Sequence, residues 1–424
     1  MAEFPPENRA LVPHPARLGE VVTVLGPGEA DLPCRTGGRA RDRIAELTAL
    51  VLDLAGEGVA IDRLAYRKSL EARSPATIKA LANDLACYAR FCHRVRGIGL
   101  PAGEGRVVAY LEDCEARGLS VATVSRRLAS LAVIHGLLGV TPPTGAPVVR
   151  DALRGFRRRR GVRQRQAGPL RLGEGIGIEA ARGFTLTALL DACPGTVAGL
   201  RDAALLSLGY DAGLRVSELV AIDCGHISRL DDGAGVLDVV RSKTDQEGRG
   251  GEAWLSPETM RRIALWREAG GIASGPLFRR IATTRTRARE AVPPTRLDRL
   301  AWHARVDPVR LEGAPARPAS VTYRIGEHAL TPAAVRMIIK RTAHRAVDEG
   351  LVALFGPERD AAIAALSTHS LRVGLTQDLF ASGEDAGPIA QALRWTSTTT
   401  ALRYGRALTP AANATARMLR NLRG

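Results

Sequence analysis

One stretch near the end of the chain decides how the rest is interpreted: LSTHSLRVGLTQDLFASGEDAGPIAQALRWTSTTTALRYGR, residues 366–406. Thr368 precedes an apolar-periodic segment and is a plausible N-cap, so the segment up to Phe380 is predicted to be helical. On such a helix His369 and Arg372 lie three residues apart and share one face.

Two aromatic residues follow this pair of cationic side chains. Ala386–Leu393 predicts another helix, Trp395 comes after it, and Tyr404 lies nine residues further on a short helix. A phenol, an indole donor, an imidazole and a guanidinium in one pocket suit attack by the tyrosine on a phosphodiester, with the guanidinium holding the phosphate oxygens. The alternative is a surface helix with an ordinary ion pair, because a histidine and an arginine at this spacing are common.

The charge balance favours a polyanionic partner. The chain has 424 residues, with 60 Lys and Arg against 44 Asp and Glu, which gives a net charge of +16. The length predicts two domains. Such an excess is unusual for an enzyme of small metabolites and suits nucleic acid. General solubility is the alternative, but the basic residues are clustered.

Cysteine spacing indicates reduced thiols, and hydropathy gives no sign of a signal peptide or a membrane helix. The six cysteines form no Cys-x-x-Cys pair, so we expect reduced, mostly buried thiols and no zinc site. The N-terminus MAEFPPENRALVPH lacks the apolar core of a signal peptide, and no run approaches the ~20 apolar residues of a membrane helix. We expect no membrane association and a cytoplasmic location, in a bacterial or phage context and close to the nucleoid.

The N-terminal half predicts an arm followed by a helical domain. Residues 1–40 are rich in Pro and Gly and are expected to be mostly disordered. Residues 41–156 show helical periodicity, with Ser74 and Ser120 each opening a helix, and predict an all-helical bundle. Its basic positions could contact DNA or could be solvated faces of core-forming helices; the candidates are Lys79, Arg90, Arg126 and Arg127.

A basic segment separates the two halves of the chain. Nine arginines and a single acid, Asp151, lie between residues 150 and 171. Such a run repels itself and is best neutralised by phosphates. We therefore expect residues 157–182 to be an interdomain linker that follows the DNA backbone, with phosphate contacts from Arg157, Arg158, Arg159 and Arg160.

The second half contains two further motifs. In GLRVSELVAI, residues 213–222, Arg215 and Glu218 have the spacing of an (i, i+3) salt bridge on a helix. Val236–Val240 and Glu252–Leu255 flank a polar turn and predict a β-hairpin. Lys243 lies at the start of that turn, where a lysine is usually a solvated charge.

Two segments near the C-terminus lack a clear place in a compact domain. Residues 279–328 are long, low in periodicity and rich in arginine, and we interpret them as an insertion that adds DNA contacts. Residues 411–424 predict a short helix with one apolar side, which is too short to be stable alone. It could pack on its own domain or dock on a neighbouring subunit.

Together these motifs resemble the tyrosine recombinases, also called the phage integrase family. The family pattern is His-x-x-Arg, then His or Trp, then Tyr nine residues later, preceded by a Gly-Leu-Arg-x-x-Glu-Leu block and a hairpin lysine, here in RSKT. Trp in the second histidine position is closest to the Cre-like branch. The resemblance implies an active site made of Arg215, Lys243, His369, Arg372, Trp395 and Tyr404, supported by Glu218.

The resemblance also implies a mechanism. Tyr404 would form a 3′-phosphotyrosyl link while the two arginines neutralise the phosphate oxygens. His369 would assist proton transfer at the tyrosine, Trp395 would donate its indole N–H, and Lys243 would protonate the 5′ oxygen. The implied reaction requires neither metal nor any other cofactor.

The implied fold is mostly α, with an N-terminal all-helical bundle and an α+β catalytic domain that contains a small β-hairpin or sheet. The catalytic domain would span residues 183–410, and the two domains would form a clamp on DNA. The implied function is site-specific recombination at double-stranded DNA target sites by a tetrameric synaptic complex. Two alternatives remain: a type IB topoisomerase-like strand-passage enzyme, and a non-catalytic DNA-binding regulator with the same fold.

Overall fold

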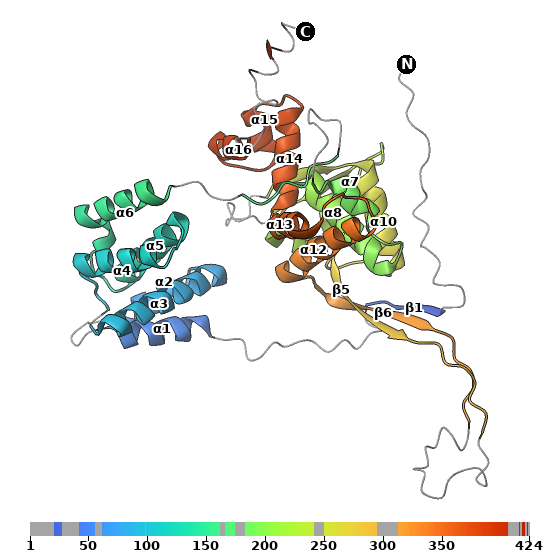
Figure 1. Cartoon of the computed structure of the whole chain (residues 1–424), viewed down its shortest axis with the longest axis horizontal. Coiled ribbons are helices and arrows are strands. Elements are labelled where there is room, and N and C mark those ends of the chain that lie inside the picture. Colours follow the sequence, from blue (N-terminus) through green and yellow to red (C-terminus); the bar gives the residue numbers. More distant parts are fainter. Residues whose placement is uncertain are drawn as a thin grey trace, which may run out of the picture. The chain divides into compact units, whose positions relative to one another are not determined.

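The computed structural model of the chain contains two compact units (Figure 1). The helical unit spans Cys34–Gln166, and the mixed unit combines Met1–Pro33 with Ala167–Gly424. The structure describes residues 21–27, 42–55, 62–97, 99–161, 166–173, 183–240, 250–294, 313–405, 415, 418, 419 and 422. In this described part the fold is mostly α with small sheets, which confirms the predicted fold class.

The helical unit is a bundle whose apolar faces meet in one core. Leu85, Tyr88 and Tyr110 are almost completely buried there. Ser74 and Ser120 cap two of its helices through their side-chain oxygens, as predicted. The helices are α1 (Arg43–Leu54), α2 (Arg63–Glu71), α3 (Pro75–Val95), α4 (Glu104–Ala116), α5 (Val121–Leu137) and α6 (Pro147–Arg160).

The arginine-rich stretch is partly helical, so the prediction of a linker beginning at residue 157 is wrong. Arg157–Arg160 form the last turn of α6, which ends at Gly161. Arginine is a good helix former, and cations are favourable at the negative end of a helix dipole. Phe156 is completely buried and anchors this end of α6 in the core.

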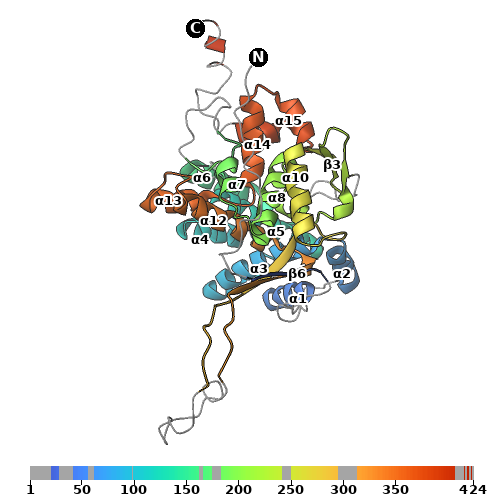
Figure 2. The ribbon, with the colours of Figure 1, turned by 90° about the vertical axis from the view of Figure 1, so that its right-hand side faces the viewer.

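The mixed unit packs helices around a second core. Its helix α10 contributes the fully buried Trp266, whose indole N–H donates to the Leu277 carbonyl oxygen at 2.8 Å. Helices α8 and α10 lie side by side (Figure 2). The helices are α7 (Leu186–Asp191), α8 (Val197–Asp211), α9 (Val216–Val220), α10 (Pro257–Ala269), α12 (Pro332–Asp348), α13 (Gly356–Ala365), α14 (Ser370–Ala381), α15 (Ala386–Ala392) and α16 (Thr398–Gly405).

One small sheet of the mixed unit contains the predicted hairpin. Strands β2 (Ile227–Arg229), β3 (Gly235–Asp238) and β4 (Glu252–Leu255) pair antiparallel in that order. Leu237 and Leu255 are completely buried, because alternate residues of β3 and β4 face the core. The turn between β3 and β4, residues 241–249, lies outside the described residues.

The second sheet corrects one prediction. Its strands are β1 (Val21–Leu25), β6 (Ser320–Ala329) and β5 (Arg279–Thr286), in the order β1-β6-β5. A disordered arm over residues 1–40 is therefore wrong for residues 21–25, which pair parallel with β6. Residues 279–328, which are low in periodicity and which we interpreted as an insertion, nevertheless contain regular structure, since β5 and β6 form an antiparallel ladder. Residues 295–312 lie outside the described part.

The ladder of β5 and β6 continues beyond the three-stranded region. Isolated bridges pair Arg289 with Arg317 and Val292 with Ala314, in the same register as the strands. Figures 1 and 2 both show these two segments running away from the helices of the mixed unit as a ribbon. We call residues 285–294 and 313–321 the ribbon.

A buried carboxylate anchors helix α14 in the mixed unit. Asp378 accepts hydrogen bonds from the Leu172 backbone N–H at 2.8 Å and from the Tyr210 hydroxyl at 2.5 Å. It also forms an ion pair with the buried Arg171. The extended segment 168–172 and helix α8 are thereby attached to α14, so this segment belongs to the mixed unit and not to a free linker.

The expectations about cysteines, membrane helices and the C-terminal helix can be compared with the structure only for the described residues. The described cysteines are free thiols, and Cys34 lies outside the described residues. No helix in the described part is long and apolar enough to cross a bilayer. Most of residues 411–424 also lie outside the described part.

Candidate active site

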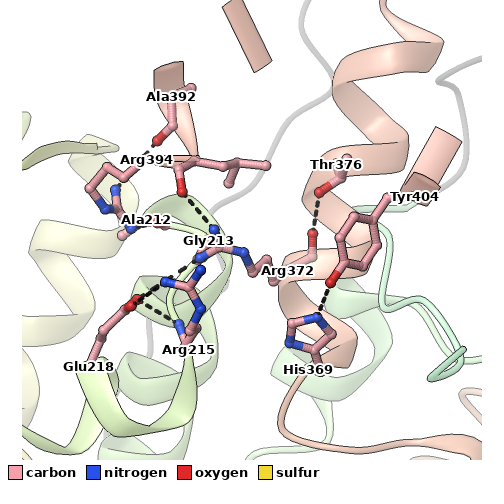
Figure 3. Close-up of polar contacts among 11 residues, drawn as sticks. Ala212, Gly213, Arg215, Glu218, His369, Arg372, Thr376, Ala392, Arg394 and Tyr404 are labelled. Carbon is pink, nitrogen blue, oxygen red and sulfur yellow. Dashed lines mark hydrogen bonds and ion pairs between the residues drawn. The ribbon is translucent and has the colours of Figure 1, made fainter. Parts of the chain in front are cut away.

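The first component of the site is an ion pair between the partly exposed Arg215 and the buried Glu218 at the start of α9. Arg215 is the residue directly before this helix. Its backbone N–H and its Nη1 donate to the two carboxylate oxygens of Glu218, each at 2.8 Å (Figure 3). Glu218 is only 4% exposed, so this doubly bonded carboxylate fixes the direction of the guanidinium.

The second component is a guanidinium enclosed by main-chain carbonyl groups. Arg372, from α14, is 1% exposed and donates to the carbonyl oxygens of Gly213 and Leu393, each at 2.6 Å. Its Nη1 lies 3.9 Å from a carboxylate oxygen of Glu218. Burial, together with the neighbouring Arg215, lowers the pKa of Arg372 to about 10, so it remains charged at neutral pH.

The third component is a hydrogen-bonded pair of histidine and tyrosine. The imidazole Nε2 of His369 is hydrogen-bonded to the hydroxyl of Tyr404, and Figure 3 shows the phenol directed at the ring. Helix α14 starts with His369, and not Thr368, at its N-cap. The reason is a preceding turn in which the Ser367 hydroxyl accepts from the His369 backbone N–H.

The environment sets the protonation of this pair. Burial lowers the pKa of His369, and the cationic Arg372 and Arg215 lower it further. Burial raises the pKa of Tyr404, although the same two arginines oppose the rise. At neutral pH the tyrosine is therefore protonated and the imidazole is a neutral group able to accept its proton.

Trp395 contacts both the Tyr404 ring and the Arg372 guanidinium. Its indole stacks on the Tyr404 ring at 5.2 Å between centroids and 9° between planes. The Arg372 guanidinium carbon lies 4.9 Å from the centroid of the same indole, within the range of a cation–π contact. The structure thus brings five of the six predicted residues together: Arg215, His369, Arg372, Trp395 and Tyr404. The sixth, Lys243, lies outside the described residues.

Two known recombinases are similar to the chain in sequence. No family model matches the chain. The chain is 26% identical over 384 residues to the recombinase Cre of Escherichia phage P1, a match covering 88% of this chain and 96% of that protein. It is 30% identical over 226 residues to an integrase/recombinase XerD homolog of Selenomonas ruminantium, covering 51% and 63% respectively. Both relatives are recombinases, and these matches support the tyrosine recombinase family that the motifs resemble.

Solved structures of recombinases resemble the chain more loosely. XerH site-specific recombinase in a post-cleavage complex with palindromic difH substrate is matched over 90% of this chain and 92% of that one, with 12% identity and a TM-score of 0.47. A lambda integrase dimer bound to a COC′ core site is matched over 85% and 81%, with 13% identity and a TM-score of 0.46. The support for the family therefore comes from the sequence matches.

Sequence reasoning missed one arginine beside the site, Arg394. Arg394 has φ +54°, a left-handed conformation that glycine adopts far more readily than arginine. Its Nη2 donates to the Ala212 carbonyl oxygen at 2.8 Å, directly before the Gly213 carbonyl that Arg372 binds. Its position directly before Trp395 in the sequence could have marked Arg394 as a candidate. No sequence rule predicts an arginine with a left-handed backbone.

The predicted DNA-binding residues of the helical unit differ in their availability. Lys79, Arg90, Arg157 and Arg158 are exposed. Arg126 is about half exposed and forms an ion pair with the buried Asp84.

Three more of these predicted contacts are engaged within the protein. Arg127 is only 9% exposed and donates to Cys87, Cys114 and Tyr110, so its prediction as a surface DNA contact is wrong. Arg127 occurs on the buried side of α5, which helical spacing alone did not reveal. Arg159 makes a bidentate pair with Glu115, and Arg160 donates to the Glu115 carbonyl oxygen.

The buried carboxylate of Glu218 is expected to be essential for stability. Glu218→Gln should lower the free energy of unfolding by roughly 2–4 kcal/mol, because the amide nitrogen cannot accept the bonds that Arg215 donates. Urea denaturation followed by circular dichroism measures the change. Glu258→Gln is the control: its pairs with Arg261 and Arg262 are partly exposed, and its effect should stay below about 1 kcal/mol. Equal losses for both variants would contradict the assignment.

Proposed function

We propose that the chain is a site-specific DNA recombinase that cleaves and rejoins duplex DNA through a 3′-phosphotyrosyl intermediate on Tyr404. One observation carries the proposal: the Tyr404 hydroxyl is hydrogen-bonded to a neutral imidazole and adjoins a site built from Arg372, Arg215 and Trp395. The relationship to Cre over 88% of the chain supports it. The tryptophan also favours the Cre-like branch.

The chemical step follows from the order of these groups. The Tyr404 oxygen attacks the scissile phosphorus as its proton passes to Nε2 of His369. The bond between phosphorus and the 5′ oxygen breaks, and Lys243 supplies the proton that the leaving oxygen needs. Attack by the 5′ hydroxyl of another strand reverses the step. One phosphodiester is exchanged for another at each stage, so no external energy source enters the balance.

The surrounding side chains stabilise the charge that develops on phosphorus. Arg215 and Arg372 face the non-bridging oxygens in this proposal, and both are held by other groups before any substrate arrives, which reduces the reorganisation required. Trp395 keeps the Tyr404 ring in one orientation by stacking on it. Its indole N–H has no hydrogen-bond partner among the described residues and can donate to a phosphate oxygen.

The ribbon offers a basic surface for duplex DNA. Residues opposite each other in an antiparallel ladder share a face, and alternate residues return to it. The pairing of residue 285 with 321 and of 289 with 317 therefore puts Arg285, Arg287, Arg289 and Arg317 on one face. All four are exposed, and their side chains make no hydrogen bond or ion pair with a described residue. A two-stranded ribbon fits the major groove.

Recombination also requires self-association. The proposed assembly is a tetramer on two double-stranded target sites, in which residues 411–424 of one subunit dock on the next. The reaction would take place on nucleoid or phage DNA in the cytoplasm. A type IB topoisomerase-like enzyme would share the covalent step and lack the strand exchange, and a non-catalytic regulator would lack both.

The covalent intermediate provides the direct test. Wild-type protein incubated with nicked duplexes from the DNA that flanks its gene should form adducts that survive SDS and map to discrete ends. Tyr404→Phe should bind the same duplexes and form no adduct, because only the nucleophilic oxygen is removed. Tyr323→Phe, which removes a buried hydroxyl in β6, is the control and should still form adducts. Adducts from Tyr404→Phe at wild-type yield would remove Tyr404 from this role.

The pH dependence of cleavage should report His369. Its pKa lies below the ordinary value near 6.5, and the base must be unprotonated to act. With DNA below its Kd, the rate constant for adduct formation should be flat above about pH 7 and should fall only below about pH 6.5. His369→Gln should lose this acidic limb together with most of the rate. A midpoint above 6.5 would contradict the assignment.

The arginine face of the ribbon should contribute to binding in a salt-dependent manner. Replacing Arg285, Arg287, Arg289 and Arg317 with Gln should weaken binding of unrelated duplexes alike. The slope of log K against log salt should become shallower by about 0.9 for each phosphate that the variant no longer neutralises. The charge-matched control replaces arginines that already pair with carboxylates: Arg67, Arg261, Arg345 and Arg359. An unchanged slope in the ribbon variant, or an equal change in the control, would contradict this role.

A further inference from the structure

Arg394 occupies a position that helices normally reserve for glycine. Helix α15 ends with the Trp395 backbone N–H donating to the Ala390 carbonyl at 2.7 Å and the Arg394 N–H donating to the Gln391 carbonyl at 3.0 Å. This pair of bonds is a Schellman motif, and its left-handed residue is usually glycine because a Cβ is unfavourable there. Arginine at this position is strained, and strain of this kind persists where the surrounding structure requires it.

The strained backbone of Arg394 places its side chain where it makes hydrogen bonds with two carbonyl groups. Its Nη2 donates to the Ala212 carbonyl oxygen at the end of α8, and its Nη1 lies 3.4 Å from the Ala392 carbonyl oxygen. Arg372 makes a parallel connection, since it binds the carbonyls of Gly213 and Leu393. Two arginines thus join the same two loops by four hydrogen bonds, one from α14 and one from within the α15–α16 loop (Figure 3).

The aliphatic part of the same side chain reaches a third segment. At Gly251 a Cβ would come within 2.8 Å of the Arg394 Cδ, so the arginine packs directly on this backbone. Gly251 accepts a hydrogen bond from the Val239 N–H at 2.8 Å and closes the base of the β3–β4 hairpin. Lys243 belongs to the turn of that hairpin. Arg394 is thus in contact with the segments that lead to Arg215, Trp395 and Lys243.

We propose that Arg394 is a positioning residue that aligns these three segments, and that its strained backbone is retained for this alignment at the expense of stability. The inference rests on the proposed function, because the alignment matters only if the three segments act on one phosphate. Arg394 would act through Arg215 and Trp395, without any requirement to touch the DNA itself.

The test separates stability from catalysis with a single substitution. Arg394→Gly relieves the left-handed strain and removes the guanidinium. We expect an unchanged or higher melting temperature, an unchanged Kd for duplex DNA and adduct formation slowed at least tenfold at saturating DNA. Arg394→Lys, which keeps the charge and can donate to the Ala212 carbonyl, should recover part of the rate. Wild-type rates in Arg394→Gly, or a loss of rate that follows a loss of stability, would overturn the proposal.

Arg96 supplies a matched control. It is the other described non-glycine residue with a positive φ, +48°, and it is exposed at the end of α3 in the helical unit. Arg96→Gly should relieve comparable strain and leave the rate of adduct formation unchanged. An equal loss of rate in Arg96→Gly would attribute the effect to the backbone change and overturn the proposal.

Hydrogen exchange tests the alignment without the reaction. In Arg394→Gly, amide exchange should accelerate in peptides that cover residues 212–219 and 390–404, and it should remain unchanged there in Arg96→Gly. Unchanged exchange in both peptides would overturn the positioning role. If wild-type protein formed no adduct, the proposed function would fail, whereas the exchange measurement would still decide whether Arg394 holds the segments together.

Discussion

The buried guanidinium of Arg372 is the constraint on which the site depends. A charge that is 1% exposed is costly to desolvate, and the cost is offset only if hydrogen-bond acceptors surround it. The Gly213 and Leu393 carbonyls supply these acceptors at 2.6 Å from two distant parts of the chain. Helix α14 therefore cannot take its place unless the turn before α9 and the end of α15 take theirs, and the site assembles as one unit.

Electrostatics then makes the site receptive to an anion. Arg215 and Arg372 both lie beside one buried carboxylate, Glu218. Burial lowers the pKa of Arg394, and the charge of Glu218 partly offsets this effect. Glu218 reduces the mutual repulsion of the arginines and does not cancel their charge. An anion entering this site gains from charges that are already held in place, and that is the physical basis for assigning phosphoryl chemistry to the tyrosine beside them.

The errors of sequence interpretation arise where distant segments decide local structure. Strand β1 pairs with β6, about 300 residues further along the chain, and five apolar-rich residues after a Pro-rich start give no sign of that partner. Arg127 looks like a surface residue by composition, but its helix turns it onto Tyr110 and Cys114. The arginines 157–160 look like a flexible linker by charge, although Phe156 anchors their helix in a core.

The sequence by itself determined which residues are candidates for the site, because the spacing of His369, Arg372, Trp395 and Tyr404 and the block around Arg215 are local patterns. Local periodicity and caps also determined most of the helices, because helical hydrogen bonds join residues four apart. Only the tertiary structure decided which groups enclose Arg372 and that Arg394 belongs to the site. Those partners lie on separate elements, and their contacts exist only after long-range packing has brought the carbonyl groups and side chains together.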